Sequence, residues 1–153
     1  MEETPPWAFE VAIPALLRAA RSRYGSAIRV AFFAHGYEDM PRNGAFVLGA
    51  IVRTGAPLGK VIKSLGVSKQ TGGQLVDALV ARGYLERAVD PDDRRRLTVS
   101  LTERGAGAAE VSRQAVEAVD AALTRAVGED CIAQMRRGLA ALIDQGTTES
   151  PPP

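Results

Sequence analysis

Cysteine and histidine are almost absent from this sequence of 153 residues, which holds one of each. A single cysteine rules out a disulfide framework within the chain and any cysteine-rich zinc site. A single histidine likewise removes metal sites that are built on several histidines. Aromatic residues make up only 5% of the chain, so a platform on which nucleic-acid bases stack is not expected. We therefore expect neither a metal ion nor another cofactor.

Long apolar runs are missing as well. The most apolar stretch, residues 45–52, is far shorter than the roughly 18 to 20 residues of a membrane-spanning helix. The chain begins Met1-Glu2-Glu3, which is acidic where a signal peptide carries basic residues. The length and a hydrophobic fraction of 46% suit one globular domain with helical extensions. These features predict a cytoplasmic protein without membrane contact.

Charge of one sign is not in excess either, because 19 basic and 18 acidic residues leave a net charge of +1. The distribution of charge along the chain is more informative than its sum. Residues 53–104 hold ten basic and six acidic side chains, a net charge of +4, and the remainder carries −3. A basic region can attract an anionic polymer even when the whole protein is nearly neutral. The middle of the chain is therefore the candidate region for nucleic-acid binding.

The spacing of apolar residues predicts a mainly α-helical fold with one small β-hairpin. Apolar side chains that recur every three or four residues indicate helices at residues 14–35, 45–53, 58–65, 69–82, 103–127 and 129–144. Alternation of apolar and polar residues predicts a strand over 97–101, with 84–89 as its partner. Thr102, which follows that strand, is a candidate N-cap of the helix at 103–127. The expected order is helix, helix, helix–turn–helix, hairpin, helix, helix.

A short helix, a turn at Gly66, a second helix and a hairpin form the layout of a winged helix-turn-helix. The second helix, for which Ser68 is the expected N-cap, is the one that enters a major groove in such folds. Gly72 lies on its apolar face and lets the preceding helix approach closely. The candidate contacts to bases and phosphates are Lys60, Ser68, Lys69, Gln70, Thr71, Gly73 and Gln74. An ordinary solvated polar face is the competing interpretation.

Three consecutive arginines stand at the tip of the expected hairpin. Arg94, Arg95 and Arg96 follow directly on Asp92 and Asp93. An arginine at such a tip can enter a narrow A·T minor groove, where the negative potential is enhanced, and a neighbouring aspartate can orient it. The competing interpretation is a surface turn in which acidic and basic side chains neutralise one another.

Two segments carry the patterns of a known family. The first is Asp90-Pro91-Asp92-Asp93-Arg94-Arg95-Arg96, followed by Val99, Leu101-Thr102 and Gly105, and the second runs from Leu65-Gly66-Val67-Ser68 to Arg82-Gly83-Tyr84-Leu85-Glu86-Arg87. The first resembles the wing signature of MarR-type regulators, the multiple-antibiotic-resistance type of transcription factors, and the second is similar to their recognition helix and first wing strand. The resemblance places the wing arginine at Arg95, with Asp93 as its positioning partner.

The resemblance implies a homodimer that binds double-stranded DNA at a pseudo-palindromic operator. Its first and last helices would intertwine with those of a second copy. The chain then divides into helices of the dimerisation region at 1–44, a winged helix-turn-helix DNA-binding lobe at 45–103, further dimerisation helices at 104–145 and a disordered tail at 146–153.

The implied function is sequence-specific transcriptional regulation, in the form of a repressor that a small aromatic or phenolic ligand releases. The candidate ligand contacts are Phe32, His35, Tyr37 and Phe46. A winged-helix module for protein interaction, or for DNA binding without sequence preference or ligand control, is the alternative. No nucleophile–base pair, metal cluster or phosphate loop in the sequence points to an enzyme.

Two residues have a simpler interpretation than a functional one. His35 ends the first long helix, where it can bond carbonyl groups of the last turn. Cys131 lies beside the apolar stripe of the last helix, and we expect it to be an unreactive small core residue.

Overall fold

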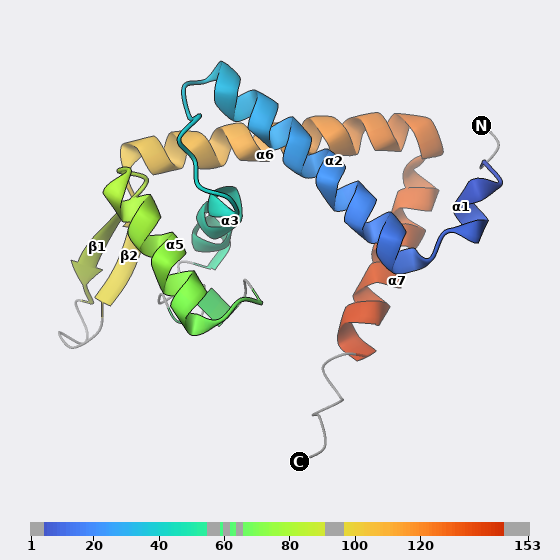
Figure 1. Cartoon of the computed structure of the whole chain (residues 1–153). Coiled ribbons are helices and arrows are strands. Elements are labelled where there is room, and N and C mark those ends of the chain that lie inside the picture. The colour runs from blue at the N-terminus through green and yellow to red at the C-terminus, as the bar shows by residue number, and fades with distance from the viewer. Residues whose placement is uncertain (1–4, 55–58, 60–61, 64–65, 91–96, 146–153) are drawn as a thin grey trace, which may run out of the picture.

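A computed structural model describes residues 5–54, 59, 62–63, 66–90 and 97–145. Its elements are α1 (Trp7–Glu10), α2 (Ile13–Ala34), α3 (Gly44–Thr54), α5 (Lys69–Ala81), β1 (Leu85–Val89), β2 (Leu97–Leu101), α6 (Glu103–Val127) and α7 (Glu129–Gln145). Figure 1 shows α3, α5 and the hairpin gathered at one end of the molecule, with α1 and α7 at the other. The mainly α-helical fold with a small antiparallel hairpin is confirmed.

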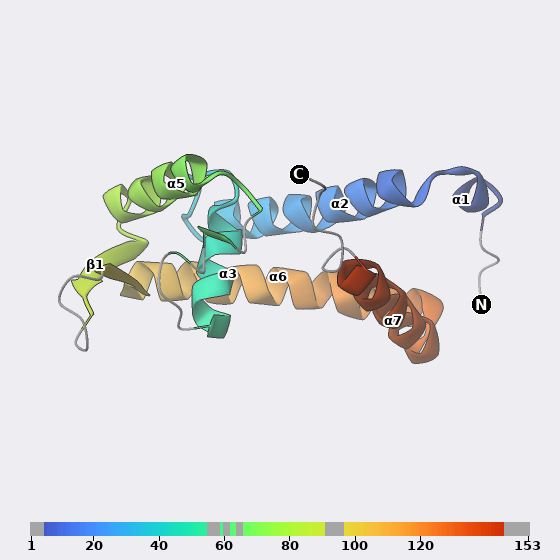
Figure 2. The ribbon, with the colours of Figure 1, turned by 90° about the horizontal axis from the view of Figure 1, so that it is seen from below.

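The two long helices α2 and α6 pack against each other, crossing at an angle in Figure 1, and connect the two ends of the molecule (Figure 2). Helix α2 begins at Ile13, within a residue of the expected start, and Pro14 occupies its first turn. The hydroxyl of Tyr24 in α2 donates a hydrogen bond to the carboxylate of Asp120 in α6. Near the other end of α2, the side chain of Phe32 is only 4% exposed.

Helix α5 begins where its capping residue predicts. The Ser68 hydroxyl accepts a hydrogen bond from the N–H of Thr71 at 3.1 Å, which satisfies one of the free donors of the first turn. The face that carries Gly72, Val76 and Leu79 is buried. The helix ends at Ala81 with Arg82 as its C-cap, and Gly83 follows with a φ of +74°, in the left-handed region that glycine adopts at helix ends.

The hairpin pairs β1 with β2 in antiparallel register, with Leu85 opposite Leu101 and Val89 opposite Leu97. Strand β1 begins one residue later than expected. The N–H of Tyr84 instead bonds the carbonyl of Leu79 at 2.9 Å and so closes the end of α5. The turn that joins the strands, residues 91–96, lies outside the described residues.

The buried core lies in the lobe and at its junction with the two long helices. Its side chains are Phe32, Val47, Leu48, Ala50, Ile51, Val76, Leu79, Tyr84, Leu85, Val99 and Ala108. Among the described residues, α1, α7 and the second half of α6 contribute no fully buried side chain to it. The end of the molecule opposite the lobe therefore has little core of its own.

Two features of the terminal helices differ from expectation. The short helix α1 was not predicted from the sequence, because four residues carry too little periodicity to be recognised. The expectation that Cys131 is a core residue is wrong for this chain, since the cysteine is exposed. Helix α7 packs against α6, and only Ile132 and Leu139 of its described side chains are partly buried.

Of the helix expected at 58–65, Gly59, Ile62 and Lys63 are helical, and the remaining positions lie outside the described residues. No helix in the described ranges combines the length and the apolar character that crossing a membrane requires.

Candidate nucleic-acid interface

The first turns of α5 present a group of polar side chains to solvent. Ser68, Lys69, Gln70, Thr71 and Gln74 are all exposed, and the apolar side of the same helix is packed into the core. The hydroxyls of Ser68 and Thr71 lie 2.8 Å apart, so the capping residue also orients its neighbour. This arrangement places polar side chains at the N-terminus of a helix, where anions bind most favourably.

Gly73 lies between these residues and is partly buried, and a Cβ built there would meet no atom within 4 Å. The space next to it is open to an approaching surface. The other expected contacts, Lys60, Asp93, Arg94, Arg95 and Arg96, lie outside the described residues. The structure therefore brings together the six described candidates on α5 and its cap, and Lys60 and the wing candidates stay predictions.

An ion pair that the sequence analysis missed connects α5 to the hairpin. The guanidinium of Arg87 in β1 contacts the carboxylate of Asp77 in α5. Asp77 is the acidic residue of the α5 polar face, and its pairing offsets a negative charge that would repel phosphate groups. The separation of ten residues in the sequence gave no local signal for this contact.

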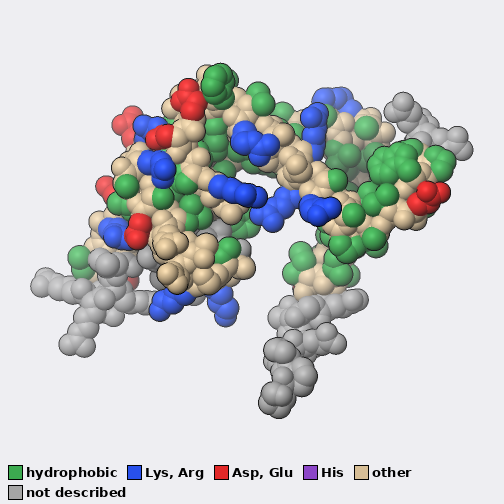
Figure 3. All heavy atoms as spheres, viewed as in Figure 1, with side chains coloured by type: hydrophobic (Ala, Val, Ile, Leu, Met, Phe, Trp, Pro, Cys, Tyr) green, Lys and Arg blue, Asp and Glu red, His purple; other side chains and the backbone are tan. Residues whose placement is uncertain are grey.

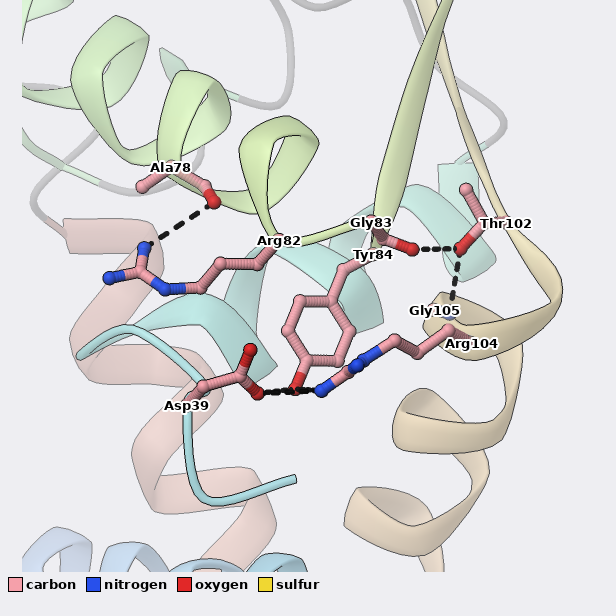
Figure 4. A network of polar contacts seen from close by, with 8 residues as sticks. All are labelled: Asp39, Ala78, Arg82, Gly83, Tyr84, Thr102, Arg104 and Gly105. Carbon is pink, nitrogen blue, oxygen red and sulfur yellow. Dashed lines mark hydrogen bonds and ion pairs between the residues drawn. The ribbon is translucent and has the colours of Figure 1, made fainter. Parts of the chain in front are cut away.

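A second group, which we call the polar joint, consists of Asp39, Tyr84 and Arg104 and lies at the base of the lobe (Figure 4). The Tyr84 hydroxyl donates to Oδ1 of Asp39. Nη2 of Arg104 donates to the same carboxylate oxygen at 2.7 Å and lies 3.0 Å from the Tyr84 oxygen. The guanidinium carbon of Arg104 is 4.6 Å from the centre of the Tyr84 ring, which is a cation–π contact.

The contacts of the polar joint change the acidity of its members. The hydrogen bond from Tyr84, together with the charge of Arg104, lowers the pKa of Asp39 below its ordinary 3.8. Burial of the ring, and then the hydrogen bond to Asp39, raises the pKa of Tyr84 above its ordinary 10.0. Asp39 is therefore a carboxylate and Tyr84 a neutral donor at neutral pH, the states that their hydrogen bond requires.

Thr102 completes the base of the hairpin beside the polar joint. Its hydroxyl donates to the carbonyl of Gly83 and accepts from the N–H of Gly105 at 3.0 Å, so it caps α6 as the sequence predicts (Figure 4). Position 105 has no room for a side chain, because a Cβ built on Gly105 would lie 1.9 Å from the carbonyl oxygen of Tyr84. The sequence indicated the capping position of Thr102, whereas the contacts of Tyr84 with Asp39 and Arg104 were not predicted.

The four candidate ligand contacts lie at the end of α2, in the segment that follows it and in α3. Phe32 is buried and packs edge to face against Tyr37, with ring centres 6.0 Å apart. Nδ1 of His35 lies 2.8 Å from the carbonyl of Ala31, the helix-end contact expected from its position. Phe46 in α3 is 48% exposed.

A shallow groove of about 190 Å³ lies away from the lobe, among α2, α6 and α7. It is lined by Tyr24, Asp120, Leu123, Thr124, Ile132, Met135, Arg136 and Leu139. Among the described residues no group of three or more histidine, cysteine, aspartate or glutamate side chains is placed to hold a metal ion.

A helix-turn-helix followed by a paired hairpin, set between long helices, is the arrangement that the resemblance implied. Residues 38–96 match the MarR family. This match extends from the residue before Asp39 through α3, α5 and β1 to the end of the wing turn. The resemblance to the MarR family drawn from the sequence is thereby confirmed. No curated protein sequence matches the chain.

Over most of its length the chain has the fold of solved MarR-type structures. The reduced form of MarR from E. coli superimposes with a TM-score of 0.67 at 23% identity, over 86% of this chain and 96% of that one. The S. aureus MepR–DNA complex superimposes with a TM-score of 0.73 at 19% identity, over 88% of this chain and 98% of that one. A cysteine-to-serine mutant of E. coli MarR in complex with operator DNA superimposes with a TM-score of 0.70 at 21% identity, over 91% of this chain and 99% of that one. These similarities establish the winged-helix MarR fold.

Proposed function

We propose that the chain is a transcriptional regulator that binds double-stranded DNA in a sequence-specific manner. In this proposal α5 enters a major groove and the hairpin reaches the flanking minor groove. MepR and E. coli MarR, which share its fold, have both been crystallised on DNA. The net charge of +4 over residues 53–104 supports an anionic partner for this part of the chain.

The observation that carries the proposal is the two-sided character of α5. Its apolar face is fixed in the core through Val76 and Leu79, and its first turns are polar, capped and exposed. A major groove is wide enough to admit one α-helix, and glutamine can bond adenine there in a bidentate manner. Gln70 and Gln74 are the proposed base contacts, and Ser68, Lys69 and Thr71 the proposed phosphate contacts.

The wing adds a contribution that rests on the sequence. We propose that Arg95, oriented by Asp93, enters the minor groove, with Arg94 and Arg96 at the adjacent phosphates. Lys60 and Lys63 would add phosphate contacts before the recognition helix. Because each neutralised phosphate releases counterions, the affinity would fall steeply as the salt concentration rises.

We also propose a homodimer, which the exposed apolar surface supports. Large apolar side chains are exposed on α1, α2 and α7, and Figure 3 shows those of α1 gathered at the end opposite the lobe. Among them are Trp7 at 57%, Phe9 at 81%, Ile13 at 65%, Leu142 at 52% and Ile143 at 70% exposure. Apolar patches of this kind mark interaction surfaces. Sedimentation that shows a stable monomer at micromolar concentration would contradict the dimer.

Selection of bound fragments from genomic DNA tests the main proposal. We expect an enriched pseudo-palindrome whose half-sites are about one helical turn apart, because the two-fold dimer presents one α5 to each half-site. Replacing Arg95 with alanine is expected to weaken binding to that DNA by about 1–3 kcal/mol at matched salt. An unchanged affinity would remove the wing from the mechanism. Flat enrichment across random sequences would favour a module that binds protein, or binds DNA without sequence preference.

The repressor role and its release by a small aromatic or phenolic ligand form the finer part of the proposal. The contacts proposed for the ligand remain Phe32, His35, Tyr37 and Phe46. The half-exposed ring of Phe46 and the exposed ring of Phe33, at 73%, offer aromatic surface to a ligand. A thermal-shift series of phenolic acids that produces no response would count against this part. The division at residues 44, 103 and 145, and the cytoplasmic location, likewise stay predictions.

A further inference from the structure

We infer that the polar joint of Asp39, Tyr84 and Arg104 positions α5 and the hairpin on α6 and thereby sets the spacing of the two DNA-reading helices. This inference rests on the proposed function, because it assigns these residues a role within DNA binding. Figure 4 shows the three side chains converging from separate parts of the chain. They come from the segment between α2 and α3, from the connection between α5 and β1, and from the first turn of α6.

Tyr84 occupies the point at which the recognition helix passes into the hairpin. Its N–H bonds the carbonyl of Leu79 in α5 at 2.9 Å, and its own carbonyl accepts from the N–H of Thr102 at 3.2 Å. Its side chain is completely buried. A displacement of Tyr84 therefore moves the end of α5 and the base of the hairpin together.

Arg104 attaches this point to the long helix α6. One nitrogen of its guanidinium reaches both Asp39 and the Tyr84 hydroxyl, at 2.7 and 3.0 Å. Charge-assisted hydrogen bonds are directional, whereas apolar burial is not. The joint therefore specifies an orientation of the lobe that apolar packing between α3 and α6 leaves less defined.

The position of the joint amplifies its effect at the proposed DNA contacts. Helix α5 has 13 residues and so spans about 20 Å. Its C-terminal end lies at the joint, and its N-terminal end carries Lys69, Gln70 and Thr71. A small rotation at Tyr84 becomes a larger displacement of those side chains, and in a dimer it acts at both half-sites.

The charged side chains of the polar joint are partly exposed, so a role in positioning the lobe can be tested separately from a role in stabilising the fold. The side chains of Arg104 and Asp39 are 43% and 46% exposed. Ion pairs with this exposure contribute little to the stability of a folded protein. Replacing the polar groups while keeping the Tyr84 ring in the core should therefore leave the fold intact and alter the geometry.

The test measures how strongly each variant distinguishes operators of different half-site spacing. The wild-type chain first supplies its operator by selection from genomic DNA, and operators with one base pair added or removed between the half-sites form the comparison series. The variants are Arg104→Gln, Arg104→Lys and Tyr84→Phe. The control is Arg113→Gln, which removes the exposed ion pairs to Glu110 and Glu117 on the same helix and touches no part of the joint.

We expect Arg104→Gln and Tyr84→Phe to weaken binding to the selected operator about 3- to 30-fold and to reduce the preference for its spacing. Arg104→Lys, which keeps the charge without the planar fork, should recover part of both. Arg113→Gln should behave as the wild type. Thermal unfolding of each variant shows whether the fold is retained. If Arg104→Gln does not fold, the spacing preference of Tyr84→Phe tests the inference.

An unchanged spacing preference in a folded Tyr84→Phe protein would overturn the inference. So would an equal loss at every spacing that follows the loss of thermal stability, because that pattern indicates a purely structural contact. If the wild-type chain selects no DNA sequence, the proposed function fails and the inference falls with it. If the wild-type chain selects an operator and the variants bind it with unaltered affinity and spacing preference, the inference is overturned and the proposed function stands.

Discussion

Gly72 of α5 lies against Ile62 so closely that a Cβ built on Gly72 would come within 2.5 Å of Cγ2 of Ile62. The Cβ of Ile62 itself would be only 3.2 Å away, so a side-chain rotation does not remove the conflict. This contact sets the distance between the two helices of the helix–turn–helix. The neighbouring glycine, Gly73, faces open space and provides a matched comparison.

We therefore expect Gly72→Ala to lower the free energy of unfolding by about 1–3 kcal/mol, since the added methyl group overpacks the helix contact. Gly73→Ala should instead raise it by about 0.5–1 kcal/mol, because alanine is the better helix former and meets no neighbour. Urea unfolding of both variants measures the difference. Equal effects of the two substitutions would show that helix propensity alone acts at these positions.

Removing the hydroxyl of Thr102 should loosen the base of the hairpin. The variant Thr102→Ala loses the cap of α6 and leaves the Gly83 carbonyl without its donor, and we expect a cost of about 1–2 kcal/mol. Thr102→Ser keeps the hydroxyl and should remain within about 0.5 kcal/mol of the wild type, the usual range of mild substitutions. Chemical denaturation measures both, and equal losses would assign the effect to the methyl group.

Asp39 should titrate at a lower pH than an ordinary aspartate. Its pKa lies below 3.8 in the folded state because Tyr84 and Arg104 stabilise the carboxylate. The resulting stability is complete above pH 3.8 and is lost as the pH falls through the lower folded value. In Tyr84→Phe the pKa of Asp39 should rise toward the ordinary value.

Carboxyl-carbon NMR shifts measure this titration, and Glu110 supplies an internal reference. Its hydrogen bonds with Arg113, and then with Gln114, lower the pKa of Glu110 to about 2, and neither partner belongs to the polar joint. Tyr84→Phe should leave that value unchanged. A titration of Asp39 that does not respond to Tyr84→Phe would show that the tyrosine does not determine it.

Two neighbouring residues of α5 should affect DNA binding in different ways. Lys69→Ala should weaken binding to all sequences alike and reduce the slope of log affinity against log salt by about 1, as expected for the loss of one phosphate contact. Gln70→Ala should cost about 1–3 kcal/mol on the selected operator and relax its preference at one base pair. Fluorescence anisotropy over a range of salt concentrations separates the two, and reversed behaviour would exchange their proposed roles.

Local patterns were sufficient to predict most elements of the fold. Periodicity placed α2 and α6 to within a residue or so, and capping chemistry located the starts of α5 at Ser68 and of α6 at Thr102. The close approach at Gly72 also followed from its place on the apolar face. These features depend on residues that are near one another in the chain, so their physical causes are present in the sequence itself.

The polar joint and the environment of α7 were decided by the tertiary structure alone. Asp39 and Arg104 are 65 residues apart, and no periodicity or capping rule connects them. Cys131 lies beside an apolar stripe and is nevertheless exposed, because among the described residues α7 packs mainly against α6, through the side that carries Ile132 and Leu139. Which side chains meet across long separations depends on how the helices cross, and the periodicity of a helix determines its apolar face without determining what covers it.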